Sequence, residues 1–531
     1  MAINSSGKLS RLWGEHRWAI LVLTAGLLLR GIAALYLPAG FDEAYYYTYT
    51  QHPSLSYFDH PALVALSTGF GPWLVGSVSP FTIRLGPLLL FSLSLWLLYR
   101  TGDRLFGKPA GWFALVIATC SPIFQLGFGT LTLPDSPLIL SWTACLYIAS
   151  QEFFPREPSH SNQVYRPTAR LAIASLLVGL ACLGKYHGAA LGFGLVLFCL
   201  LSHRHRRALL SKWVAVGVVL FAIALSPLLI WNAQHGWASF IFQFGRAASD
   251  APYRLDSLLV TWLLGIAYLF PTVGFPMWWA IARASWVTFP LRERALGNSD
   301  LALRYQFLLC VSLPIIVVFT WMGGYRSILP TWPMPGFWGI TLLLGSLTAG
   351  WWRRYPRAVW LWLWGSGLTT SVLMLVATLH IVAGVLQSPS TNALLPLVPV
   401  DSDASTELLD IEQIRQGIAD SPDLSAALDE ADFVATGEWF LSGYVAMAIA
   451  PLSDVLITCI GPDPRGFAYW DTPDLWQESG LYVATDRFGG LDILPESTVQ
   501  TVTPVGKIAL LRGGEVVEHV SFDRITLSPD I

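Results

Sequence analysis

Acidic side chains gather where this sequence leaves its first apolar segment. The stretch Gly40–Pro61 (GFDEAYYYTYTQHPSLSYFDHP) places Asp42 beside Glu43 and Asp59 beside His60. Adjacent carboxylates repel each other, most strongly where water screens poorly, so such a pair needs a proton, a metal ion or a basic partner. A carboxylate held in this way is suited to take a proton from an attacking hydroxyl group.

A second acid, Asp135, lies in the short segment Thr130–Pro137 (TLTLPDSP) between two apolar runs. Each acid also has a structural interpretation. Asp42 could cap a helix through Ala44–Gln51, with the neighbouring tyrosines as an interfacial belt, and Asp135 could cap a helix from Ser136. Because both acids lie at helix boundaries on the same membrane face, we expect them to converge on one pocket. Glu43 completes the set of catalytic candidates.

Basic residues are scarce in the segments on this face, so those present are candidates for binding phosphate. Each could instead contact lipid headgroups. Carboxylates that can accept a proton and cations that can bind phosphate, both on one face, would suit transfer of a group from a phosphate-linked donor. The candidates for binding the phosphate of such a donor, or another part of the substrate, are Asp59, His60, Lys185, Tyr186, His187, Arg246 and Arg326.

Composition indicates the class of protein that carries these residues. Hydrophobic residues make up 54% of the 531 positions and charged residues only 13%, whereas soluble domains carry about 25% charged residues. An ordinary soluble enzyme is therefore excluded, and a polytopic α-helical membrane protein is indicated. Residues 1–387 hold 26 Lys and Arg against 12 Asp and Glu, but residues 388–531 hold 6 against 23. We predict a transmembrane domain over 1–387 and a small soluble α/β domain over 388–531.

Apolar runs long enough to cross a membrane recur through the first domain. We predict about eleven transmembrane helices and a first outer loop at about 38–80, in which residues 61–78 form an interfacial helix. Basic residues alternate between loops, which by the positive-inside rule places the N-terminus in the cytoplasm and the acidic domain in the periplasm of a bacterial inner membrane. The predicted spans are 17–37, 81–99, 110–129, 137–154, 171–185, 188–202, 213–231, 257–281, 304–322, 334–351 and 358–386.

The acidic domain has the pattern of a small α/β unit without a catalytic motif. Its 23 acids favour a solvated surface over a metal site. Six cysteines occur without a CxxC spacing, so a zinc finger is not indicated. The predicted strands are 433–436, 455–460, 482–484 and 508–511, and the predicted helices lie near 407–419 and 438–449.

The chain resembles the GT-C glycosyltransferases, specifically the family-39-like protein mannosyltransferases and their bacterial relatives that transfer aminoarabinose and galacturonic acid. The resemblance rests on FDEAYYY and SYFDHPALV in the first outer loop, on TLPDSP and GKYHG, and on the later segments LPTWPMPGFW and FVATGEWFLSGYVA. It covers essentially the whole chain. It implies a GT-C fold with amphipathic helices of the first outer loop packed over the site.

The resemblance also implies a polyprenyl-phosphate-linked sugar donor and inversion at the anomeric carbon. Asp42 would be the catalytic base, Glu43 its neighbour and Asp135 the acid of the second outer loop, with Lys185 and Arg326 near the donor phosphate. Since the extended lumenal domain of eukaryotic relatives is missing, we expect an envelope lipid or polysaccharide as acceptor. A divalent cation, Mg²⁺ or Mn²⁺, stays open as a cofactor, and no spacing identifies its ligands.

Two other functions fit part of the pattern. A transporter or flippase for lipid-linked glycans would place ionisable groups in mid-membrane, where Arg30 is the clearest charge, and would often show two matching halves. No such repeat is evident. An oligosaccharide ligase or polymerase would use a diphosphate carrier. Neither reading involves a nucleic acid.

Overall fold

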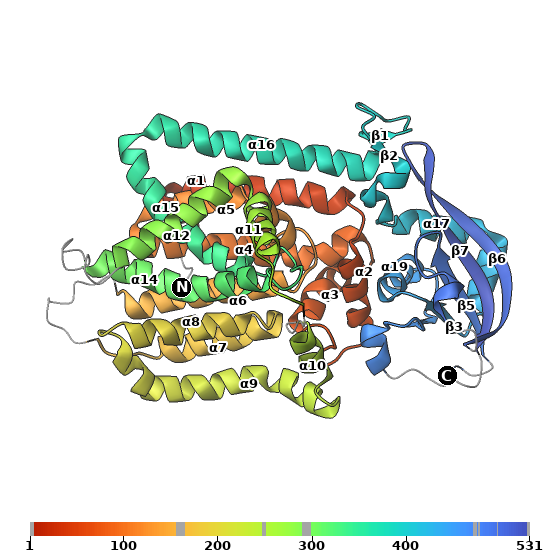
Figure 1. The fold of residues 1–531 in the computed structure, drawn as a ribbon, viewed down its shortest axis with the longest axis horizontal. Coiled ribbons are helices and arrows are strands. Elements are labelled where there is room, and N and C mark those ends of the chain that lie inside the picture. The colour runs from red at the N-terminus through yellow and green to blue at the C-terminus, as the bar shows by residue number, and fades with distance from the viewer. Residues whose placement is uncertain are drawn as a thin grey trace.

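A computed structural model of the chain describes residues 5–155, 165–246, 251–288, 299–470, 475, 478–495 and 498–527. Two parts make up the molecule. A bundle of long helices occupies one end, and a domain with a twisted sheet occupies the other, with the short helices α2, α3 and α10 between them (Figure 1).

Apolar helices account for every predicted span. An uncharged segment folds as a helix in a membrane because its backbone N–H and C=O groups then form hydrogen bonds with each other. By length and composition, five of the described helices could cross a membrane, or six if one bent pair counts as a single crossing. The predicted number of about eleven therefore stays a prediction. The helices of the bundle are α1 (Ser5–Tyr36), α4 (Pro80–Phe106), α5 (Lys108–Thr119), α6 (Asp135–Phe153), α7 (Arg170–Gly184), α8 (Gly188–Leu201), α9 (Lys212–Gln234), α11 (Leu255–Leu269), α12 (Pro271–Thr288), α14 (Ser299–Met322), α15 (Met334–Arg354) and α16 (Pro356–Ala383).

The continuous helix predicted for 257–281 is wrong. The structure divides this range into α11 and α12, which meet at 115°. Pro271 begins α12, and a proline lacks the N–H that would continue the helix and crowds the residue before it. Phe270, at the break, has a φ of +74°. In the predicted span 110–129, a short π-helix, Phe124–Phe128, follows α5.

Short helices occupy the outer loops. The predicted interfacial helix at 61–78 is observed as α3 (Leu63–Val75), which ends at Gly76 in the left-handed conformation. Helix α2 (Phe41–Gln51) carries the first acidic pair, and α10 (Ala238–Gly245) lies in a later outer segment. These elements lie between the bundle and the C-terminal domain (Figure 1).

The C-terminal domain has a five-stranded mixed sheet with the strand order β4-β3-β5-β7-β6. Strand β3 is parallel to both of its neighbours, and the ribbon of β6 and β7 extends the sheet in antiparallel fashion. The predicted strands and helices are all present; α18 and β7 were not predicted. The elements are β3 (Phe433–Thr436), β4 (Leu456–Cys459), β5 (Ser479–Thr485), β6 (Val499–Arg512), β7 (Glu515–Leu527), α17 (Ile411–Asp420), α18 (Pro422–Glu430) and α19 (Trp439–Ile449), with the short pair β1 (Gln387–Ser388) and β2 (Val398–Pro399) at its start.

Helix α19 joins the two parts by packing directly on α2. A Cβ atom at Gly443 would lie 2.3 Å from the carbonyl carbon of Ala44, so only glycine allows the two helices this close. Tyr444 donates a hydrogen bond of 2.6 Å to the carbonyl oxygen of Ala39. One apolar cluster contains Ala44 and Ile83 together with Leu441 of α19. The C-terminal domain thereby fixes the position of α2.

Candidate active site

Helix α2 presents Asp42 and Glu43 in its first turn. The helix is capped by Gly40, whose N–H donates to a Glu43 carboxylate oxygen at 2.9 Å. The alternative that Asp42 caps a helix through Ala44–Gln51 is therefore wrong, because the helix begins before it. Carboxylates in a first turn are stabilised by the N-terminal end of the helix dipole.

Glu43 is buried and fully engaged within the protein. Its carboxylate forms a bidentate pair with Arg84 of α4, at 2.8 and 2.5 Å. It also accepts a hydrogen bond of 2.8 Å from the N–H of Thr132, three residues before Asp135. One side chain thus ties α2, α4 and the second outer loop together. We interpret Glu43 as the residue that positions the two acids beside it.

Asp135 forms a buried ion pair with Lys185. The acid is the first residue of α6, and Pro134 occupies the N-cap position, so the alternative that Asp135 caps a helix from Ser136 is wrong as well. Lys185, in the turn between α7 and α8, donates to one carboxylate oxygen at 2.8 Å. The other oxygen is buried without a partner among the described residues. A buried acceptor left unpaired costs about 1–3 kcal/mol, so this oxygen is available to a further donor.

Asp42 lies among cations without bonding to any of them. The side chain is half-buried, and in the described part of the chain no hydrogen bond or ion pair engages its carboxylate. Burial raises its pKa, while the positive charges of Arg465, Lys185 and Arg246 oppose this rise. The charge of Lys185 therefore acts on both Asp42 and Asp135, and the convergence of the two acids on one pocket stays a prediction. A carboxylate that is unbonded and has a raised pKa is suited to accept a proton.

Asp59 joins the first outer loop to the C-terminal domain. Tyr45 donates to one of its carboxylate oxygens and Arg465 to the other, each at 3.0 Å. The N–H of Gly466 donates in turn to the Tyr45 oxygen at 2.8 Å. Burial raises the pKa of Asp59 to about 6, although Arg465 and Tyr45 lower it. Arg465 was not predicted, since its segment PDPRGFAYW has no motif and only the tertiary fold brings it here.

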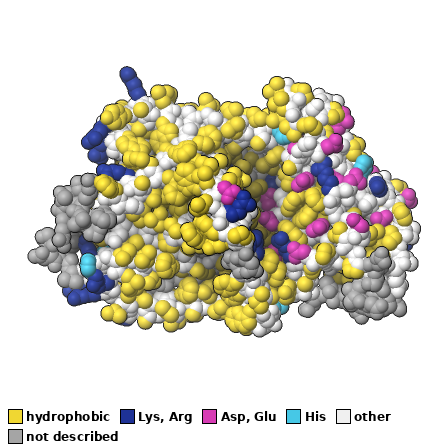
Figure 2. Space-filling model, in the orientation of Figure 1, with side chains coloured by type: hydrophobic (Ala, Val, Ile, Leu, Met, Phe, Trp, Pro, Cys, Tyr) yellow, Lys and Arg dark blue, Asp and Glu magenta, His cyan; other side chains and the backbone are white. Residues whose placement is uncertain are grey.

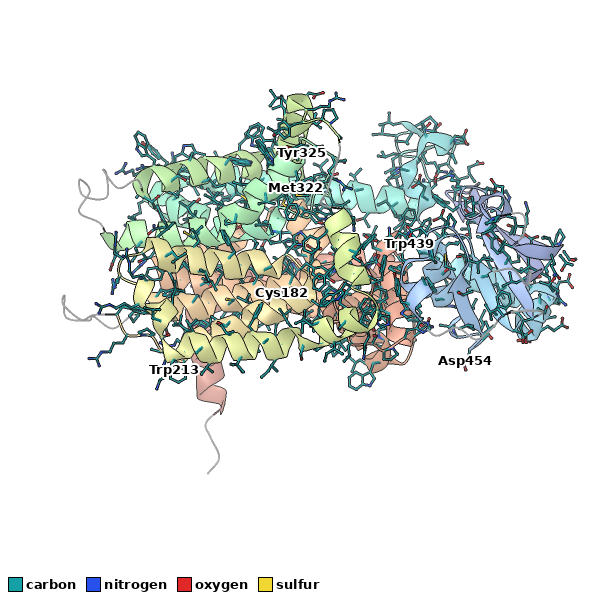
Figure 3. All side chains as sticks on the ribbon, turned by 60° about the horizontal axis from the view of Figure 1, so that its bottom comes forward. Cys182, Trp213, Met322, Tyr325, Trp439 and Asp454 are labelled. Carbon is teal, nitrogen blue, oxygen red and sulfur yellow. The ribbon has the colours of Figure 1, made fainter. Side chains whose placement is uncertain are left out.

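The tyrosines of the first outer loop form a buried cluster. Tyr49 stacks on Tyr57 at 4.0 Å, and Tyr45 contacts the ring of Trp439 at 4.9 Å. Tyr45 and Tyr49 are fully buried, so they do not form the alternative interfacial belt. Burial raises the pKa of both hydroxyls well above the usual value, and the Tyr45 hydroxyl donates to Asp59. Trp439, labelled in Figure 3, lies where the C-terminal domain meets the bundle.

The two predicted histidines lie close to these charges. The charges of Lys185 and Arg246 act on both rings. His60 and His187 each keep one buried ring nitrogen without a partner among the described residues. Burial, reinforced by Lys185, Arg246 and Arg465, lowers the pKa of His60 well below its usual value, so this ring is neutral.

Three further predicted residues lie around the outer end of the bundle. Tyr186 forms a short hydrogen bond with Ser239 of α10. The guanidinium of Arg246 lies 5.3 Å from the ring centres of Phe242 and Trp332. Arg326 donates to the carbonyl oxygen of Arg246, which links two outer segments that are far apart in sequence.

No group of three His, Cys, Asp or Glu side chains among the described residues is arranged to hold a metal ion. The divalent cation that the sequence leaves open as a cofactor therefore has no preformed cage of protein ligands in this part of the chain. The arrangement instead offers one unbonded carboxylate and several cations beside the membrane. Such a site can remove a proton from a hydroxyl group and stabilise a departing phosphate.

Comparison with known proteins identifies relatives. Residues 59–231 match the family model described as dolichyl-phosphate-mannose-protein mannosyltransferase. The lipid A galacturonosyltransferase RgtD of Rhizobium johnstonii is 25% identical over 344 residues, which are 64% of this chain and 66% of that protein. The matched part is thus slightly under two thirds of the length of this relative.

Solved structures establish the fold. The crystal structure of ArnT from Cupriavidus metallidurans in the apo state matches with a TM-score of 0.59 at 16% identity. The same protein bound to undecaprenyl phosphate matches with a TM-score of 0.60 at 15% identity. Both comparisons cover 96% of this chain and 98% of the ArnT chain. The chain is a multi-pass membrane protein with the GT-C fold, which it shares with ArnT.

Proposed function

We propose that this protein moves a sugar from a polyprenyl-phosphate carrier to an envelope lipid or polysaccharide, with inversion at the anomeric carbon. The observation that carries the proposal is the unbonded Asp42 carboxylate, set among the charges of Lys185, Arg246 and Arg465. The relative RgtD is named for transfer to lipid A, and ArnT was crystallised with undecaprenyl phosphate. Both relatives support a lipid-linked donor and a lipid acceptor.

The chemistry follows from the positions of the charges. An acceptor hydroxyl attacks the anomeric carbon and its proton passes to Asp42, while the bond from that carbon to the phosphate oxygen breaks. The electron pair of that bond leaves with the polyprenyl phosphate, whose growing negative charge Lys185, Arg246 and Arg326 stabilise. Attack opposite the leaving group inverts the carbon.

The proposed orientation places the site in the periplasm of a bacterial inner membrane and the N-terminus in the cytoplasm. Figure 2 supports it: Lys and Arg gather at the end of the bundle far from the C-terminal domain, where the positive-inside rule requires them, and Asp and Glu lie over the C-terminal domain. A protease that reaches the C-terminal domain in spheroplasts, but not in intact cells, would support this orientation. Cleavage only after inner-membrane rupture would overturn it.

Transport is the weaker alternative. The mid-membrane charge Arg30 donates hydrogen bonds to Gln125 at 2.8 Å and Ser92 at 3.1 Å and lies over the ring of Phe91. These contacts anchor the π-helix before the second outer loop. A structural arginine of this kind does not make a pathway for a polar substrate.

Transfer is tested with purified protein in sealed lipid vesicles. Polyprenyl monophosphate and diphosphate carriers of the same sugar are each supplied with lipid A as acceptor, and products are identified by mass spectrometry. We expect one sugar mass on the acceptor from the monophosphate donor alone. Transfer only from the diphosphate would favour a ligase, and movement of the carrier across the bilayer without a new bond would favour a flippase.

The same assay addresses the divalent cation. Because the described residues form no three-ligand cluster, a cation taking part would share its coordination with the donor phosphate. We expect EDTA to lower the rate less than tenfold, with the side-chain cations stabilising the leaving group. Complete loss that Mg²⁺ or Mn²⁺ restores would make the metal an essential cofactor.

A further inference from the structure

Arg465 is a cation that the C-terminal domain places in a site otherwise built by the transmembrane domain. Its guanidinium lies 3.7 Å from the ring centre of Trp439, at the start of α19. It also bonds to Asp59 in the first outer loop. Among the charges that lower the pKa of Asp42, that of Arg465 has the largest effect. The residue thus belongs to the surroundings of the proposed base, although the chain separates them by more than 400 positions.

Two features distinguish Arg465 from an ordinary structural arginine. Its φ of +46° lies in the left-handed region, which a residue with a side chain adopts only at a conformational cost of about 1–3 kcal/mol. Arginine has five N–H donors, and the described residues engage only two of its nitrogen atoms, Nη1 with Asp59 and Nε with Asp463. The side chain keeps 22% of its surface exposed. It can therefore hold Asp59 and bind a second anion at the same time.

The geometry of the displacement indicates whether this second anion belongs to the donor or to the acceptor. In a displacement with inversion, the attacking hydroxyl and the departing phosphate lie on opposite sides of the anomeric carbon. In the proposed reaction the membrane-borne phosphate is bound by Lys185 and Arg246, which come from turns of the transmembrane domain. Arg465 comes from the C-terminal domain, which lies beyond α2 as seen from the bundle (Figure 1). Figure 2 shows the surface hollowed between the two parts.

We propose that Arg465 binds a phosphate or carboxylate group of the acceptor and so directs the acceptor hydroxyl toward Asp42. This inference rests on the proposed function and adds a requirement to it, namely an anionic acceptor. Trp439 holds the guanidinium plane, and Asp59 keeps it turned toward the first outer loop. The segment FVATGEWFLSGYVA, which contains Trp439, then carries part of the acceptor site.

The test measures KM separately for each substrate. We expect Arg465→Ala to raise KM for lipid A about tenfold to hundredfold, as loss of a charged hydrogen bond would, and to leave KM for the donor unchanged. The lipid A KM of Arg465→Lys should lie between those of the wild type and Arg465→Ala, because lysine keeps the charge but lacks the planar guanidinium group. With a dephosphorylated lipid A, the wild type and Arg465→Ala should have the same KM.

Arg524→Ala is the matched control, since Arg524 lies in the same domain and pairs with the exposed Glu430. It should change neither KM. An unchanged acceptor KM in Arg465→Ala, or a rise in the donor KM alone, would overturn the inference while wild-type transfer still upholds the proposed function. Absence of wild-type transfer would instead remove the proposed function itself. If Arg465→Ala does not fold, the comparison is made with Arg465→Lys and the two acceptors.

Discussion

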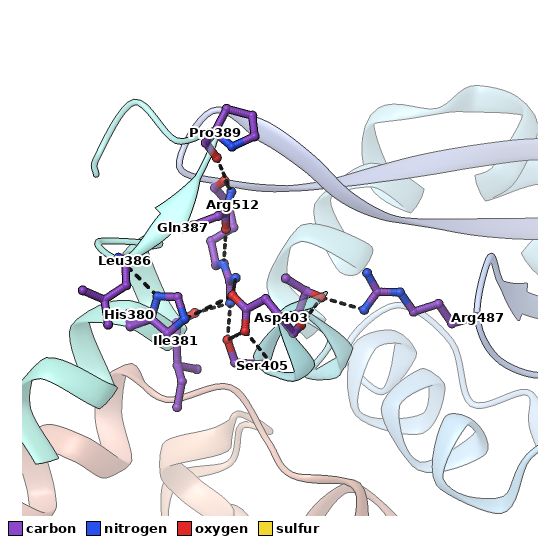
Figure 4. Close-up of polar contacts among 10 residues, drawn as sticks. His380, Ile381, Leu386, Gln387, Pro389, Asp403, Ser405, Arg487 and Arg512 are labelled. Carbon is purple, nitrogen blue, oxygen red and sulfur yellow. Dashed lines mark hydrogen bonds and ion pairs between the residues drawn. The ribbon is translucent and has the colours of Figure 1, made fainter. Parts of the chain in front are cut away.

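Two buried ionic clusters join the transmembrane domain to the C-terminal domain, and they differ in how completely their polar atoms are bonded. The first surrounds Asp403 at the end of α16 (Figure 4). Asp403 pairs with Arg512 and with His380, the latter at 3.1 Å. Arg512 also donates to Gln387 at 2.7 Å and to Ser405 at 2.8 Å.

Every charge in this first cluster has a partner. Burial tends to raise the pKa of Asp403, but hydrogen bonds from Ser405 and the charge of Arg512 lower it overall. A saturated cluster of this kind leaves no atom for a ligand. We interpret it as a latch that fixes the C-terminal domain to the end of α16.

The second cluster, around Asp42, is unsaturated. Asp42 has no hydrogen-bond partner in the described chain, and Asp135, His60 and His187 each keep a buried polar atom unpaired. Native proteins pair the great majority of such atoms. The two clusters therefore differ in that the latch engages all of its charges, whereas the cluster around Asp42 keeps polar atoms available to the proposed substrates.

The largest expected effect comes from the unsaturated cluster. Asp42→Asn keeps the shape of the side chain but removes the base, so we expect the transfer rate to fall about 10²- to 10⁴-fold. The thermal unfolding midpoint should not fall, because no bond is lost. Asp454→Asn, a change at an exposed acid of the C-terminal domain, is the control. Full activity of Asp42→Asn would contradict the assignment of the base.

Lys185→Met should reduce both activity and stability. It leaves Asp135 buried and unpaired, and removing one partner of a buried ion pair costs about 3–5 kcal/mol. The double variant Lys185→Met, Asp135→Asn should regain most of the stability without regaining transfer. Unfolding in detergent and initial rates measure the two effects. Recovery of activity in the double variant would show that the pair is only structural.

The transfer rate should also fall as pH falls through about 6, and loss of the folded state would not explain this fall. As pH falls through about 6, Asp59 takes up a proton and its pair with Arg465 loses one charge, so the rate should fall about tenfold per unit at most. The neighbouring charged and titratable groups are Asp42, Tyr45 and Arg465.

Stability should move the opposite way. An acid whose folded pKa lies above its unfolded value binds its proton more tightly when folded, so its contribution to stability increases as pH falls from about 6 to 4. Rates and unfolding midpoints from pH 5 to 8 check both trends. A rate that falls only where the midpoint also falls would contradict the role of Asp59. In Asp59→Asn, the step near pH 6 should disappear.

The sequence predicts the helices and the two acids because their signals are local. Apolar length predicts the spans, and helix boundaries place Asp42 and Asp135 on one face. Arg465 and the positioning role of Glu43 could not be predicted, since each depends on contacts between distant segments. Arg84, for example, binds Glu43 from 41 positions away. The bend between α11 and α12 could have been predicted from Pro271, but the continuous apolar composition of this segment favoured a single span.

The smallest expected effect on transfer comes from the latch. Asp403→Asn removes the charge that Arg512 and His380 share, so we expect a loss of about 3 kcal/mol in stability. The rate per folded molecule should stay within twofold, because the variant leaves every unbonded atom around Asp42 in place. Unfolding midpoints and rates corrected for the folded fraction measure the two quantities. If transfer instead fell as far as in Asp42→Asn, complete hydrogen bonding would not distinguish a structural cluster from the proposed active site. The change at Asp403 would then have to alter the position of α2 through α17 and α19.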